Sequence, residues 1–247
     1  MILIHPDREA LSLAAAELFV REACEAVADR GRFTVLLSGG ETPRRTYELL
    51  AEPHRRERIP WDRVHLFWGD ERCVPRDDPR SNYRMARRAL IDHVPVPPSN
   101  VHPIACEGSA DAGAARYEAE LGAVSQGAIP RFDLVFLGIG EDGHIASLFP
   151  GSPLLGEPDR LVAVATKADE AIQRVTVTVP VINQAALIVF LVSGEGKAAI
   201  VREALAGMRE VPARLIHPVD GRLLWLLDEE AVKLVEEDRI RGEGVKL

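Results

Sequence analysis

His144 closes the stretch Gly138-Ile-Gly-Glu-Asp-Gly-His144, which directly follows an apolar run typical of a buried strand. An imidazole titrates near neutral pH, so a histidine on a loop at the end of a strand is suited to proton transfer. Asp142 stands two residues earlier and could orient the imidazole. The pattern fits a catalytic histidine, and a histidine with a purely structural role is the alternative.

The same stretch formally matches the GxGxxG fingerprint of dinucleotide-binding proteins, from Gly138 to Gly143. Two features argue against a dinucleotide site. Pro150 would stop any following helix within about two turns, and a bulky imidazole directly follows the third glycine. We therefore interpret the stretch as a glycine-rich loop that carries a histidine.

A second glycine loop, Ser38-Gly39-Gly40-Glu-Thr42-Pro43, follows an earlier apolar run. Thr42 is suited to cap a helix, and Pro43 to open it, because a proline loses no hydrogen bond there. The two glycines let the backbone turn tightly and offer N–H groups to an anion. No Gly-Lys-Ser/Thr follows, so this is not a Walker loop. A phosphate cradle and a plain strand-to-helix turn both fit.

Charged residues follow two further apolar runs. Asp70 and Arg72 come after one run, where Arg72 could clamp an anion through its planar guanidinium. Asp70 is either a site residue or a salt-bridge partner within the loop. Lys197 lies in Ser-Gly-Glu-Gly-Lys, at the start of a predicted helix, where a cation is mildly unfavourable. It therefore indicates an anionic ligand, with a solvated lysine as the alternative.

Apolar runs alternate with segments of helical periodicity along the chain, which predicts an α/β fold. The predicted strands are residues 33–37, 64–68, 134–137, 174–179, 187–192 and 223–227. The predicted helices are residues 11–29, 43–51, 81–91, 110–122, 195–206 and 229–237. We expect a three-layer αβα arrangement, with a mostly parallel Rossmann-like sheet and helices on both faces, forming one domain over residues 1–247. Ligands of such sheets bind beyond the carboxyl ends of the strands, where the loops described above lie.

Composition limits the possible partners of this 247-residue chain. It has 30 Lys and Arg against 38 Asp and Glu, for a net charge of −8, which disfavours a nucleic-acid or anionic-membrane partner. The N-terminus has no signal-peptide pattern, and no apolar stretch is long enough to span a membrane, so we expect a cytoplasmic protein. The three widely spaced cysteines Cys24, Cys73 and Cys106 predict reduced thiols. No histidine pair has metal-ligand spacing, which predicts no metal site.

Taken together, these segments resemble the 6-phosphogluconolactonase family, within the superfamily of glucosamine-6-phosphate deaminase and ribose-5-phosphate isomerase-like folds. The resemblance covers nearly the whole chain, and the 138–153 segment is its most specific part. The motifs that carry it are LSGGETP at 37–43, FWGDERCVP at 67–75, RSNY at 80–83, GIGEDGHIASLFPGSP at 138–153, RVTVT at 174–178 and SGEGK at 193–197.

The resemblance implies hydrolysis of 6-phospho-D-glucono-1,5-lactone to 6-phosphogluconate in the oxidative pentose phosphate pathway, with no metal or organic cofactor. His144 would activate water and later protonate the leaving ring oxygen, with Asp142 as its orienter. Arg72 and backbone N–H groups would contact the oxyanion or the phosphate. The small-molecule phosphosugar lactone is the expected partner of a monomer or small homo-oligomer. The residues assigned to substrate and phosphate binding are Ser38, Gly39, Gly40, Thr42, Asp70, Arg174 and Lys197.

Two other functions are compatible with the same loops. The deaminases of the superfamily carry an Asn-Glu-Pro triplet shortly after the histidine, and its glutamate tunes that histidine. Phe149 stands where that glutamate would be, so a deaminase or sugar-phosphate isomerase would lack a needed partner. A non-catalytic sugar-phosphate sensor is disfavoured because no DNA-binding helix-turn-helix motif or second domain is visible.

Overall fold

The computed structural model describes residues 1–125, 128–168, 170–207 and 210–241. A parallel sheet of seven strands crosses the molecule, in the order β1-β10-β9-β6-β2-β3-β5. Its strands are β1 (Ile2–His5), β2 (Phe33–Leu37), β3 (Val64–Trp68), β5 (Val101–His102), β6 (Leu134–Leu137), β9 (Leu187–Val192) and β10 (Arg222–Asp228). Every residue of the central strands β2, β6 and β9 is buried, as expected for apolar runs covered on both faces.

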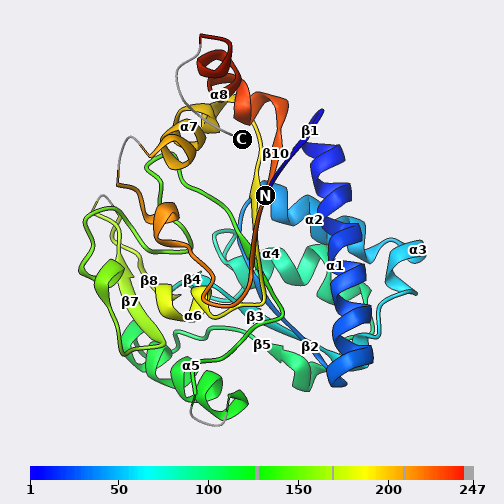
Figure 1. The fold of residues 1–247 in the computed structure, drawn as a ribbon. Coiled ribbons are helices and arrows are strands. Elements are labelled where there is room, and N and C mark those ends of the chain that lie inside the picture. The colour runs from blue at the N-terminus through cyan, green and yellow to red at the C-terminus, as the bar shows by residue number, and fades with distance from the viewer. Residues whose placement is uncertain (126–127, 169, 208–209, 242–247) are drawn as a thin grey trace.

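Helices lie on both sides of this sheet, so the predicted α/β class and layered arrangement are confirmed. Figure 1 shows α1 and α2 on one side, and α5 and α7 on the other. The helices are α1 (Arg8–Arg30), α2 (Glu41–Ala51), α3 (Pro53–Arg56), α4 (Asn82–Ala89), α5 (Ala110–Val124), α6 (Val179–Asn183), α7 (Ala198–Ala206) and α8 (Glu229–Arg241). None of the helices described is long and apolar enough to cross a membrane.

One of the predicted strands does not belong to the main parallel sheet but to a second, smaller sheet. The strand predicted at 174–179 is β8 (Gln173–Val177), which lies between β4 (Asp70–Arg72) and β7 (Val162–Thr166) in an antiparallel sheet. The strand itself was predicted correctly, but its apolar composition does not reveal which strand it pairs with. Helix α5 packs against this sheet, which therefore forms part of the layer opposite α1.

Two details of the loops also differ from the predictions. Helix α2 begins at Glu41 with Gly40 as its N-cap, so Thr42 and Pro43 lie inside the first turn rather than at its start. A proline is still tolerated there because the first N–H groups of a helix have no partner within the helix. Cys73 and Cys106 form a disulfide, contrary to the prediction of reduced thiols, while Cys24 is free. The cysteine spacing could not show that the loop after β4 meets the loop before α5.

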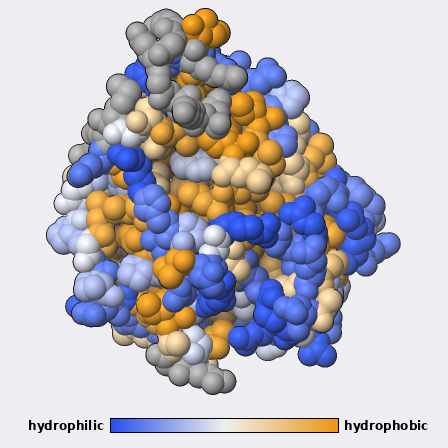
Figure 2. Space-filling model, viewed as in Figure 1, coloured by the Kyte–Doolittle hydropathy of each residue, from blue (hydrophilic) through white to orange (hydrophobic). Residues whose placement is uncertain are grey.

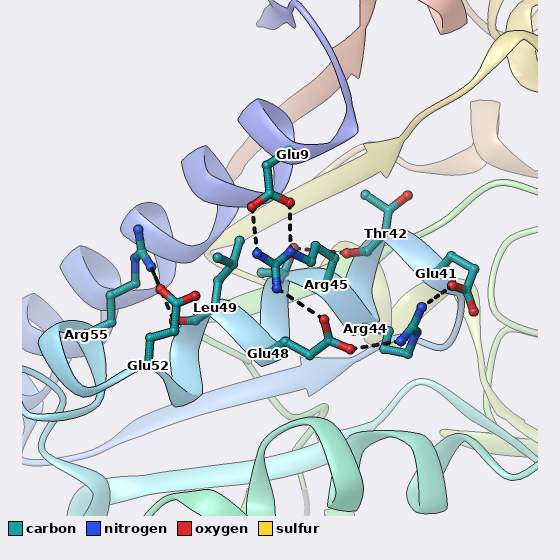
Figure 3. A network of polar contacts seen from close by, with 10 residues as sticks. Glu9, Glu41, Thr42, Arg44, Arg45, Glu48, Leu49, Glu52 and Arg55 are labelled. Atoms are coloured by element: carbon teal, nitrogen blue, oxygen red, sulfur yellow. Dashed lines mark hydrogen bonds and ion pairs between the residues drawn. The ribbon is translucent and has the colours of Figure 1, made fainter.

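Charged side chains cover the outer surface of the α1–α2 side. In Figure 3, the guanidinium of Arg45 on α2 makes two hydrogen bonds to Glu9 on α1 and a third to Glu48. Exposed pairs of this kind each contribute about 0–1 kcal/mol, so they orient the helices more than they hold the core together. Figure 2 shows the corresponding hydrophilic surface over the α2 and α3 side of the molecule.

The strand order places four loops side by side. From β2 the chain continues to β3 and β5 on one side and then returns to β6 on the other. The loops after β2 and β6 therefore flank a topological switch point, where open parallel sheets bind ligands. The loops after β3 and β9 lie next to them, because β3 neighbours β2 and β9 neighbours β6.

Two buried tyrosines hold the strand ends at this edge. The hydroxyl of Tyr117 accepts a hydrogen bond from Trp68 N and donates one to Trp68 O, each 2.9 Å long. Strand β5 ends opposite Phe67, so the tyrosine replaces the missing strand partner. Tyr47 makes the same pair of bonds, each 3.0 Å long, to the backbone of Ser38.

We expect Tyr117→Phe to lower the free energy of unfolding by about 1–3 kcal/mol, because both backbone groups of Trp68 lose their buried partner. Urea denaturation monitored by tryptophan fluorescence measures this change. Tyr83→Phe is the matched control, since Tyr83 contacts Trp68 through its ring alone, and a change below about 0.5 kcal/mol is expected. Equal stability of the two variants would contradict the role of the Tyr117 hydroxyl.

Candidate active site

A pocket of about 220 Å³ opens where the four loops meet. The sequence-predicted residues that line it are Ser38, Gly39, Gly40, Asp70, Arg72, His144, Arg174 and Lys197. Asp142 lies behind His144 and does not line the pocket. Thr42 is buried in the first turn of α2, where its carbonyl oxygen accepts a hydrogen bond from Thr46. The structure thus brings together all the predicted site residues except Thr42.

His144 is held by Asp142 in a defined orientation. The carboxylate Oδ1 of Asp142 lies 2.5 Å from Nδ1 of the imidazole and 3.1 Å from the backbone nitrogen of His144. Burial raises the pKa of Asp142, but these two hydrogen bonds and the nearby imidazole outweigh burial and lower it. The ionised carboxylate can only accept a hydrogen bond, so the proton of the neutral imidazole lies on Nδ1 and Nε2 carries the free lone pair. The imidazole is 26% exposed, so water and a small ligand can reach it.

The glycine loop allows this arrangement because it leaves room for the imidazole. A Cβ atom on Gly140 would lie 2.1 Å from His144 Nδ1 and 2.7 Å from Asp142 Oδ1. Gly143 has a φ of 87°, in the region that favours glycine. The loop closes through a hydrogen bond from Gly140 N to His144 O and another from Gly143 N to Gly140 O.

Asp70 is buried beside the pocket and joins three segments. Its carboxylate accepts hydrogen bonds from Ser147 Oγ at 2.6 Å and from Asn82 Nδ2 at 3.1 Å. Only 5% of Asp70 is exposed, so this carboxylate is fixed by its partners. The amide of Asn82 also occupies the space where a Cβ on Gly39 would lie. Sequence reasoning missed Asn82 and Ser147 as parts of the site, because neither stands directly after a strand of the main sheet.

Glu71 fixes the start of α4 from beneath the pocket. Its carboxylate accepts hydrogen bonds from Ser81 Oγ and from the backbone nitrogens of Arg72, Asn82 and Tyr83. Burial raises the pKa of Glu71 although all four bonds favour the ionised form. The carboxylate therefore has a structural role that holds Asn82 and Arg72 in place.

Arg72 and Arg174 lie directly opposite each other on β4 and β8. Like charges directly opposite each other across strands repel, and Glu170 offsets this repulsion only from outside the pocket. The Nε atoms of both side chains are buried and have no hydrogen-bond partner. On the outer side, Arg174 Nη2 pairs with Glu170, whose pKa falls to about 2 because of Arg174 and Lys167. The arrangement predicts that an anion in the pocket would bind the two guanidinium groups.

Lys197 is the third cation of the pocket and precedes α7 as its N-cap. It lies in a short 3₁₀ turn, Glu195–Lys197, rather than in the first turn of an α-helix as predicted. The buried Asp228 holds this loop by accepting hydrogen bonds from Gly194 N and from Ala231 N in α8. Across residues 1–125, 128–168, 170–207 and 210–241, no group of three His, Cys, Asp or Glu side chains could hold a metal ion.

Comparison with known proteins places the chain in a family. Residues 6–225 match the family model described as glucosamine-6-phosphate isomerases/6-phosphogluconolactonase. The chain therefore belongs to this family, as its motifs predicted. Its fold is shared by the solved structure of 6-phosphogluconolactonase from Trypanosoma brucei, with a TM-score of 0.84, 30% identity and coverage of 95% of this chain and 98% of that one.

Curated relatives named 6-phosphogluconolactonase are more similar in sequence. The Synechocystis protein is 45% identical over 214 residues, covering 84% of this chain and 86% of that protein. The Mycobacterium tuberculosis protein is 40% identical over 239 residues, covering 93% and 96%. A monomeric glucosamine-6-phosphate deaminase, with a TM-score of 0.80 but 23% identity over 94% of this chain and 99% of that chain, shares only the fold.

We expect Gly140→Ala to lower the activity of the site sharply, because its Cβ would push the imidazole of His144 away from Asp142. A displacement of about 1 Å can cost a hundredfold in rate. Steady-state kinetics measures the loss, and urea denaturation checks that the variant is folded. Gly156→Ala is the matched control, since a Cβ there meets no atom within 4 Å and Gly156 does not line the pocket. Equal loss in both variants would contradict this account of the loop.

Proposed function

We propose that the protein hydrolyses 6-phospho-D-glucono-1,5-lactone to 6-phosphogluconate, the second step of the oxidative pentose phosphate pathway. The observation that supports this most is one pocket that holds both an oriented, accessible imidazole and three cationic side chains. A phosphorylated lactone needs both, since its carbonyl requires an activated water and its phosphate requires an anion site. The 40–45% identity to curated 6-phosphogluconolactonases agrees with this activity.

In the proposed mechanism, Nε2 of His144 takes a proton from a water molecule while the oxygen of that water attacks the carbonyl carbon of the lactone. The carbonyl becomes an oxyanion, which Arg72 and backbone N–H groups of the glycine loops stabilise. Collapse of this intermediate breaks the bond to the ring oxygen. The imidazolium returns its proton to that oxygen, and the product is the open-chain acid. Asp142 keeps Nδ1 protonated and the ring in place throughout.

The phosphate end of the substrate is assigned to the loop Ser38–Gly40 together with Arg174 and Lys197. Backbone N–H groups at this turn and the two side chains provide donors for a dianion. Binding the phosphate confines the substrate so that its carbonyl stays near His144 without any extra contact to the reacting carbon. Thr42 does not line the pocket, so its part in phosphate binding is limited to shaping the turn.

Deamination of glucosamine 6-phosphate is the rival activity within the family. Phe149 packs against the imidazole of His144 with ring centroids 5.0 Å apart, at the position where the family resemblance implies a glutamate in a deaminase. An apolar ring can neither accept nor donate a proton. We therefore expect no ammonia release from glucosamine 6-phosphate, and release at a rate comparable to lactone hydrolysis would contradict the proposal.

The proposed reaction uses no metal or organic cofactor. A cytoplasmic location, a monomer or small homo-oligomer, and the absence of a nucleic-acid partner stay predictions from the sequence.

We expect His144→Ala to lower kcat/KM by about two to four orders of magnitude, the usual contribution of general base catalysis. The lactone can be generated enzymatically and its disappearance followed above the spontaneous background. The thermal unfolding midpoint of the variant provides the folding control. Wild-type activity in the folded variant would remove His144 from the mechanism.

We expect Lys197→Ala to raise KM about tenfold with little change in kcat, because a charge-assisted contact to the phosphate is lost in ground state and transition state alike. Unphosphorylated glucono-1,5-lactone should be turned over equally by the variant and the wild type. Lys233→Ala is the matched control, since Lys233 pairs with Glu195 of the same turn and does not line the pocket. A fall in kcat alone would assign Lys197 to the transition state instead.

A further inference from the structure

The ring of Phe149 contacts the two functional groups of the pocket at once. Its centroid lies 5.0 Å from that of the His144 imidazole, with 51° between the ring planes. The guanidinium carbon of Arg174 lies 5.4 Å from the same ring. Phe149 is 7% exposed and does not line the pocket, so it supports both groups from behind. His144 belongs to the loop after β6 and Arg174 to β8, and the ring connects the two.

The backbone on either side of Phe149 is held rigidly. Two residues earlier, the fully buried Ser147 donates through Oγ to Asp70 and through its backbone nitrogen to Thr176 Oγ1. Leu148 N donates to Ile145 O at 2.8 Å, and Ser152 N donates to Phe149 O at 3.1 Å. The backbone that carries the ring is therefore held by the second sheet and by Asp70, without the need for a ligand.

An aromatic ring suits this position for an electrostatic reason. Its face attracts the guanidinium of Arg174 without neutralising it, so the charge stays available to an anion. A carboxylate at the same place would pair with Arg174 and compete with a phosphate. Toward His144, the ring carries no hydrogen-bonding group, so it limits rotation of the imidazole without competing for Nε2.

We propose that Phe149 is a positioning and specificity-determining residue that places His144 for catalysis and Arg174 for phosphate binding. This inference rests on the proposed function and goes beyond it. It predicts two separable effects of removing the ring. Loss of the contact with His144 lowers kcat for any lactone, and loss of the contact with Arg174 raises KM for phosphorylated lactones only.

The test compares wild type, Phe149→Leu and Phe149→Met on 6-phosphogluconolactone and on glucono-1,5-lactone. We expect both variants to lower kcat about tenfold on both lactones, through misplacement of the imidazole. KM for the phosphorylated lactone should rise about two- to fivefold, the equivalent of a lost cation–π contact, with KM for the other lactone unchanged. Phe149→Tyr keeps the ring, so its kcat and KM should stay close to those of the wild type.

Phe132→Leu is the matched control, because Phe132 is a buried phenylalanine that packs on Phe67, outside the pocket. It should lower the thermal midpoint while leaving kcat and KM unchanged. If the Phe149 variants behave like this control, Phe149 has only a structural role and the inference is wrong. Phe149→Met retains most of the side-chain volume, so the comparison remains possible if Phe149→Leu does not fold.

A readout independent of turnover separates this inference from the proposed function. The ring current of Phe149 should displace the proton NMR signals of the His144 imidazole, which are assigned by their loss in His144→Ala. Phe149→Met should change the chemical shifts of these signals. Unchanged shifts would contradict the contact between the Phe149 ring and the imidazole. Absence of lactone turnover by the wild type would instead refute the proposed function, while the NMR comparison would still test the contact.

Discussion

The site depends on the parallel arrangement of β9, β6, β2 and β3. Adjacent parallel strands all end at the same edge of the sheet, so the loops that follow them converge without any contact between their own sequences. The strand order puts the loop of His144 beside the loop of Ser38, because β6 pairs with β2. Every residue of β2 and β6 is buried, and Thr34 is their only polar residue, which makes the edge a rigid support for the polar side chains of the loops.

At and just beyond the ends of the strands, buried side chains form hydrogen bonds with backbone groups that have no partner in the sheet. Tyr47 and Tyr117 each bind both backbone groups of one residue at a strand end, and Asp228 holds the turn after β9. Glu71 accepts a hydrogen bond from the start of α4, and Asp70 accepts one from Ser147 in the loop after β6. The loops are thus fixed before a ligand arrives, which lowers the cost of reorganisation when charge develops in a reaction.

The electrostatics of the pocket differ from those of the whole chain. The protein carries a net charge of −8, yet Arg72, Arg174 and Lys197 all line one small pocket. At physiological ionic strength, exposed charges are screened beyond about 8 Å, so a local group of cations can attract an anion to an acidic protein. The carboxylate of Glu170 pairs with Arg174 from outside this pocket, so it orients the guanidinium without filling the anion site.

The sequence by itself determined the central strands of the main sheet, since apolar runs at 33–37, 64–68, 134–137 and 187–192 are strands with those bounds, whereas β1, β4, β5 and β7 were not predicted. It also determined the glycine loops and the family, because these depend on residues close together in the chain. Only the tertiary structure decided the strand order, the antiparallel pairing of β8, the disulfide of Cys73 with Cys106, and the bond from Ser147 to Asp70. Such contacts join segments that are far apart in the chain: 33 residues separate the two cysteines and 77 separate Ser147 from Asp70. No periodicity or spacing in one sequence records which distant segments pack together.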